Sequence, residues 1–93
     1  MKAIICTQYG GPDLLQFAEI SLPEIEMDQV AIDVHYCGVN FPDTLIIQNK
    51  YQFKPPLPFS PGGEIAGIVT AVGSAVNHCK VGDRVMAFCG WGG

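Results

Sequence analysis

The chain has 93 residues, of which 48% are hydrophobic and 15% are charged, and its formal net charge is −4. This length allows one small domain with one core. Five scattered basic residues cannot neutralise a phosphate backbone, so we predict no nucleic-acid partner. No run of about 18 apolar residues is present, so we also predict no membrane insertion and no export. The apolar excess indicates surface that is meant for a partner.

The cysteines show neither the paired spacing of a metal or redox motif nor a tight disulfide framework. We therefore expect reduced thiols and a cytoplasmic protein. The four are Cys6, Cys37, Cys79 and Cys89.

The first third of the chain alternates between apolar strands and turn residues. Residues 2–8 and 14–20 are predicted to be two strands joined by a glycine and proline turn at 9–13. Residues 30–37 alternate in the pattern of a half-buried strand whose polar side faces outward. The predicted inward side chains are Val30, Ile32, Val34 and Tyr36.

The rest of the chain is predicted to contain one short helix and two more strands. Pro42 suits a first helical turn, so we expect one or two turns within 42–49. Residues 51–61 contain four prolines and must be an extended loop. Strands are expected at 64–72, with a bulge or close backbone approach at Gly67, and at 84–89.

Five short strands with frequent turn signals and little helical periodicity predict a mostly β, barrel-like domain that spans residues 1–93. The glycines at 62, 63, 67 and 73 lack both the spacing of a phosphate-binding turn and a helix after them. We interpret them as residues that the backbone conformation requires.

Three motifs occur in a characteristic order: YCGVNFPD at 36–43, PGGEIAGIV at 61–69 and VGDRV at 81–85. Together they resemble the N-terminal domain of the medium-chain dehydrogenases/reductases, which has the partly open β-barrel fold of the GroES cochaperonin. The run NFPDT at 40–44 and the block PGGE at 61–64 are similar to the NADPH:quinone oxidoreductase (zeta-crystallin-like) branch. The resemblance covers nearly the whole chain.

Two positions depart from the zinc-containing members of that superfamily. Asn40 stands where those enzymes carry a cysteine ligand, and Gly63 stands where they carry a histidine ligand. Zinc needs thiolate, imidazole or carboxylate ligands in a near-tetrahedral array. The resemblance therefore implies that there is no catalytic zinc and no metal ligand in this chain.

The resemblance implies a function for a longer protein. That protein would transfer hydride from NADPH to a quinone or another conjugated small molecule, and it would form a homodimer when complete. Residues 1–93 would be an incomplete catalytic domain on the substrate side, inactive alone. A Rossmann domain absent from this chain would bind most of the NADPH.

Site residues are implied in the same way. Asn40 would lie beside the nicotinamide end of the cofactor, and Tyr51 would be the catalytic side chain at the rim of the substrate cleft. Phe41, Tyr51 and Phe53 would contact the substrate. Asp43 and Glu64 match acids that surround the metal in zinc members, and their role here stays open.

Other interpretations remain. Related enoyl-thioester reductases use a tyrosine placed like Tyr51 as a proton donor. The chain could also be a free-standing GroES-like binding module, because a fold alone does not fix function. Asn40 could be only a helix cap and Tyr51 only a packing residue.

Overall fold

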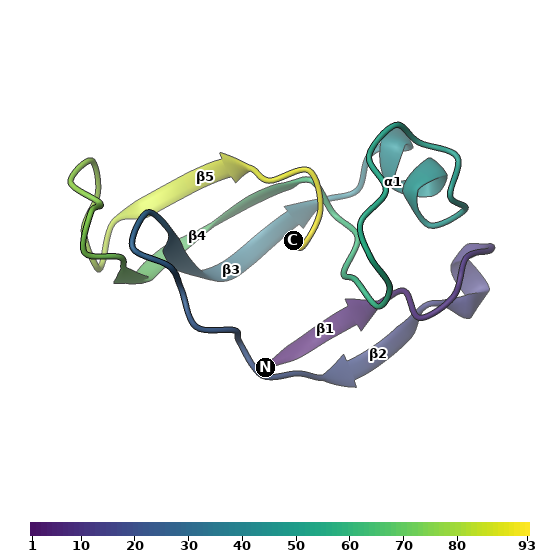
Figure 1. Cartoon of the computed structure of the whole chain (residues 1–93), viewed down its shortest axis with the longest axis horizontal. Helices are drawn as coiled ribbons and strands as arrows, with labels where there is room; N and C mark the ends of the chain where they lie inside the picture. Colours follow the sequence, from purple (N-terminus) through teal and green to yellow (C-terminus); the bar gives the residue numbers. More distant parts are fainter.

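The structure, a computed structural model, describes all 93 residues and contains two antiparallel sheets, shown in Figure 1. The first sheet pairs β1 (Lys2–Ile5) with β2 (Gln16–Glu19). The second has the order β3 (Val30–Gly38), β4 (Glu64–Val72) and β5 (Arg84–Phe88). The sheets do not close into a complete barrel, so the predicted mostly β, partly open fold is confirmed.

The hairpin of the first sheet is shorter than predicted. Pro12–Leu14 forms a 3-10 turn, which takes up the start of the expected return strand. At the other side, Cys6 leaves β1 and pairs with Phe59 of the proline-rich loop through two backbone hydrogen bonds of 2.7 and 3.1 Å. This pairing ties the hairpin to the loop, a contact between residues far apart in the sequence.

The strand predicted at 30–37 is present, but one of its side chains lies on the opposite face from that expected. The pairing with β4 shifts between Val34 and Tyr36, so His35 forms a β-bulge. Because one extra residue reverses the alternation of side chains beyond it, Tyr36 turns outward and is 77% exposed. The prediction that Tyr36 faces inward is therefore wrong.

The close backbone approach predicted at Gly67 is confirmed. Gly67 is paired with Val34 on one side and with Val85 on the other, at the centre of the three-stranded sheet. A Cβ added at this position would overlap the carbonyl oxygen of Asp33. Val69, two residues further along β4, is buried, with 1% of its surface exposed.

The predicted helix is present as α1 (Phe41–Ile46), with Asn40 as its N-cap and Pro42 in its first turn. It ends earlier than the predicted range because Asn49 has a left-handed backbone with φ of 58°. No helix of the chain is long and apolar enough to cross a bilayer.

A small core lies where the hairpin, α1 and the proline-rich loop meet. Cys6, Ile46, Ile47 and Phe59 are its buried members, and Leu15 and Tyr51 pack against them. The core therefore holds one side of the Tyr51 ring against α1, which fixes the position of this predicted site residue.

Candidate functional site

A cleft of about 250 Å³ lies at the start of α1, between the proline-rich loop and the end of β5. Its lining combines three aromatic rings with two carboxylates and one carboxamide. The lining residues are Asn40, Pro42, Asp43, Ile46, Tyr51, Phe53, Gly63, Glu64, Phe88 and Gly90.

The cleft brings together most of the site residues predicted from the sequence. Asn40, Tyr51 and Phe53 all line it. Phe41 does not, and its side chain is 73% exposed. Phe88 lines the cleft although no site role was predicted for it. The alternation of exposed and partly buried side chains along β5 places Phe88 on the same outward face as Met86. A large ring on that exposed face is the sequence signal that could have indicated Phe88 as a site residue.

Asp43 fixes the backbone of Asn40. The Asn40 N–H donates a hydrogen bond of 2.8 Å to Asp43 Oδ2, and the Asp43 N–H donates one of 3.0 Å to the Asn40 carbonyl oxygen. The Asn40 side chain faces the Asp43 N–H in a capping box but makes no capping hydrogen bond of good geometry to the helix. Asn40 also lines the cleft, so one residue both caps α1 and borders the candidate site.

The aromatic side of the cleft packs on the core at its base. The rings of Tyr51 and Phe53 meet edge to face, with centroids 5.6 Å apart and an interplanar angle of 78°. This is a favourable geometry for an aromatic pair. Because Tyr51 also packs on the core, the pair offers a preformed apolar surface to a ligand.

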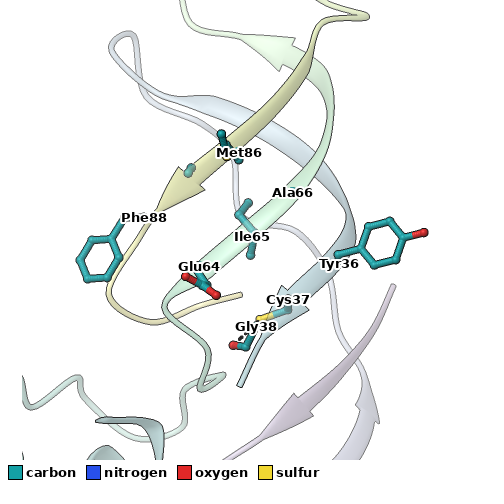
Figure 2. A pocket seen from close by; sticks show the side chains of 9 residues that line it. Tyr36, Cys37, Gly38, Glu64, Ile65, Ala66, Met86 and Phe88 are labelled. Atoms are coloured by element: carbon teal, nitrogen blue, oxygen red, sulfur yellow. Dashed lines mark hydrogen bonds between the residues drawn. The ribbon is translucent and has the colours of Figure 1, made fainter. Parts of the chain in front are cut away.

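A second and larger hollow, of about 580 Å³, lies beside the cleft on the outer face of β3, β4 and β5. Figure 2 shows its side chains, with Tyr36 and Phe88 on opposite sides and Glu64 between them. Glu64 and Phe88 line both hollows. Tyr36, Met86 and Phe88 are each more than three quarters exposed, so this face is a broad apolar surface.

Two thiols lie near the cleft and are held in the protonated form. The Cys89 thiol donates a hydrogen bond to the carbonyl oxygen of Gly63, with a distance of 3.5 Å from Sγ to the oxygen. Burial raises the pKa of both Cys37 and Cys89, and the Asp43 carboxylate adds to the rise in each. At neutral pH neither is a thiolate nucleophile, and all four cysteines are free in the structure.

The chain offers no place for the pyrophosphate of a dinucleotide. Such a site needs a strand, a glycine-rich turn and a helix whose N-terminus faces the phosphates, and the only α-helix has six residues. Cβ atoms added at Gly67 or Gly73 would overlap backbone carbonyl groups, so these glycines serve close packing. No group of three or more His, Cys, Asp or Glu side chains is arranged to hold a metal ion.

Comparison with known proteins identifies relatives for nearly the whole chain. The rat quinone oxidoreductase-like protein 2 is 44% identical over 91% of this chain and 24% of its own length. The solved structure of Escherichia coli quinone oxidoreductase complexed with NADPH matches 92% of this chain and 26% of that one, with 38% identity and a TM-score of 0.85. The solved structure of the human synaptic vesicle membrane protein VAT-1 homolog-like protein matches 98% of this chain and 29% of that one, with 36% identity and a TM-score of 0.90.

The chain thus spans about a quarter of the length of these relatives. Residues 26–92, which include α1 and the whole three-stranded sheet, match the family model described as the alcohol dehydrogenase GroES-like domain. The sequence motifs had predicted the same family. Relatives named quinone oxidoreductase or quinone oxidoreductase-like protein are among those that match it. The chain therefore belongs to the alcohol dehydrogenase GroES-like domain family.

Proposed function

We propose that this domain forms the acceptor side of an NADPH:quinone oxidoreductase that works without zinc. The observation that carries the proposal is the cleft, in which Tyr51, Phe53 and Phe88 surround a small space next to the carboxamide of Asn40. Apolar pockets with a few convergent polar groups are typical of small-molecule sites. A flat conjugated ring matches this lining.

The residues at two positions of the cleft support a reaction without a metal. Asn40 and Gly63, which stand where zinc relatives carry ligands, both line this cleft. Neither supplies a thiolate or an imidazole. Reduction of a simple carbonyl needs a Lewis acid for the developing alkoxide. A quinone spreads the developing charge over its π system, so hydrogen-bond donors suffice.

Within this proposal each side chain has a stated part. When bound, NADPH supplies the hydride. Asn40, which lines the cleft, would lie next to the nicotinamide end, and its carboxamide would orient the reacting groups. Tyr51, which the resemblance implies as the catalytic side chain, acts in this proposal through its ring and holds the acceptor together with Phe53. Phe41, outside the cleft, contacts only an acceptor that extends past it.

The rest of the cofactor site would come from a Rossmann domain elsewhere in the polypeptide. The relatives are about four times as long as this chain, which supports such a domain. We call the longer polypeptide the intact protein. A homodimer and a cytoplasmic location remain part of the proposal.

The first test compares two acceptors in the intact protein. We expect NADPH oxidation with a quinone, little oxidation with an enoyl thioester, and a change of less than about 3-fold in quinone turnover on Tyr51→Phe, which keeps the ring. General acid catalysis by the hydroxyl would instead contribute about 10²–10⁴-fold. Steady-state kinetics with both acceptors measures the difference.

The second candidate function is reduction of an enoyl thioester. The position of Tyr51 in the same cleft as Asn40 favours it, since a phenol there could donate a proton. Turnover of the thioester alone, abolished by Tyr51→Phe, would replace the quinone proposal with this one.

Removal of metal ions is expected to leave the activity unchanged. After dialysis against a strong chelator, the intact protein should retain its quinone turnover, and elemental analysis should find less than about 0.1 zinc per chain. The physical reason is the donor set, since a carboxamide and a glycine replace two zinc ligands. Stoichiometric zinc bound at Asn40 and Gly63 would contradict the proposal.

A further inference from the structure

The aromatic side of the cleft continues beyond its lining. Phe53, which lines the cleft, also meets Trp91, with ring centroids 6.4 Å apart and an interplanar angle of 53°. Tyr51, Phe53 and Trp91 therefore form a row from the buried core to the surface. Phe53 is 41% exposed and Trp91 is 40% exposed, so both keep ring surface that residues 1–93 do not cover.

The segment that carries Trp91 is held in place from both sides. Before Trp91, the Cys89 N–H donates a hydrogen bond of 2.7 Å to the Gly63 carbonyl oxygen. After Trp91, the Gly92 N–H donates a hydrogen bond of 2.7 Å to the Ser60 carbonyl oxygen. These bonds fix the backbone around the ring to residues 60–63, the stretch that leads into β4.

The two glycines that flank Trp91 explain how the ring reaches this position. Gly90 and Gly92 have φ of 80° and 94°, in the left-handed region that side chains other than glycine rarely adopt. Each has open space where a Cβ would be, so the backbone conformation and not crowding requires glycine. A tight turn therefore presents one large ring beside Gly90, which itself lines the cleft.

We propose that Trp91 is a specificity-determining residue of this site, and that with Phe53 it forms an aromatic wall that selects fused two-ring acceptors over single-ring ones. This inference rests on the proposed function for the chemistry of the acceptor. The wall consists of Phe53, which lines the cleft, and Trp91, which packs against Phe53.

The position of Trp91 explains the selection. Trp91 packs against Phe53 but is not among the residues that line the cleft. In this proposal a single ring held at Tyr51 and Phe53 does not reach Trp91, whereas a second fused ring extends past Phe53. There it meets the free face of Trp91, and offset or edge contacts between aromatic rings add affinity beyond the area that they bury.

The test uses the intact protein with a single-ring and a fused two-ring quinone. On Trp91→Leu, we expect the KM of the two-ring quinone to rise about 5-fold and that of the single-ring quinone to change less than about 2-fold. Trp91→Phe, which keeps a ring, should fall between the two. Phe17→Leu is the matched control, because Phe17 is an exposed ring on β2, outside the cleft.

A binding measurement without NADPH separates this inference from the proposed function. The two-ring quinone should quench a part of the tryptophan fluorescence that Trp91→Phe lacks, and Trp91→Leu should weaken its binding in calorimetry. Quenching and weakened binding without turnover of either quinone would support the wall and overturn the proposed reaction. Turnover with equal effects of Trp91→Leu on both quinones, or no binding of the two-ring quinone, would overturn the wall.

Discussion

Replacement of Asn40 by alanine is expected to slow quinone reduction by the intact protein about 100-fold while barely changing its melting temperature. The rate falls because the carboxamide orients the reacting groups, and small misplacements cost about 10²-fold. Most of the stability is kept because the Asn40 side chain, although it faces Asp43 in the capping box, makes no capping hydrogen bond of good geometry, and the bond from the Asn40 N–H to Asp43 survives the substitution. Single-turnover rates and thermal unfolding measure the two effects.

The matched control is Gln52→Ala, which removes a carboxamide close to Tyr51 but outside the cleft lining. It should leave the rate within about 2-fold. The affinity for NADPH should change little on Asn40→Ala, since the pyrophosphate is bound elsewhere. A loss of stability of about 1 kcal/mol with an unchanged rate would show instead that Asn40 is only a helix cap.

Local sequence patterns were sufficient for the second sheet and for the start of α1. The alternation of 30–37 and the apolar stretches at 64–72 and 84–89 correspond to β3, β4 and β5. Pro42 and Asn40 mark the beginning of the helix. These features depend on residues close together in the chain, so the sequence contains their signals.

Features that depend on distant contacts were not predictable in the same way. Nothing near His35 indicates that it will be the extra residue of a bulge, because the bulge is defined by the pairing with β4. For the same reason the pairing of Cys6 with Phe59, which shortens β1, has no local signal. The bulge turns Tyr36 outward and so enlarges the exposed apolar face.

The candidate site was predicted in part. Resemblance to a family identified Asn40, Tyr51 and Phe53, and the structure brings all three to one cleft. Phe88 and Gly90 join them because the antiparallel pairing of β4 and β5 places Phe88 opposite Glu64. That proximity follows from strand register, which composition and motif spacing do not specify.

The second large effect is expected from Gly67→Ala, which should destabilise the domain by about 3 kcal/mol or more. The added methyl group would overlap the Asp33 carbonyl oxygen and lie 2.9 Å from Ile32 Cγ2. Gly67 does not have a left-handed backbone, so the cost comes from crowding alone. For a domain of this size we expect the melting temperature to fall by roughly 12 °C or more.

Gly11→Ala provides the control for Gly67→Ala, because its added Cβ would meet only the mobile end of Asp13 at 2.7 Å. Its backbone φ of −73° suits alanine, so the free energy of unfolding should change by less than about 0.5 kcal/mol.

β4 is the central strand between β3 and β5, and its first residue, Glu64, lines the cleft. Crowding at Gly67 should therefore also weaken quinone binding at temperatures where the domain is still folded. A fully stable Gly67→Ala protein with unchanged binding would mean that β3 and β4 are not packed as closely as the structure places them.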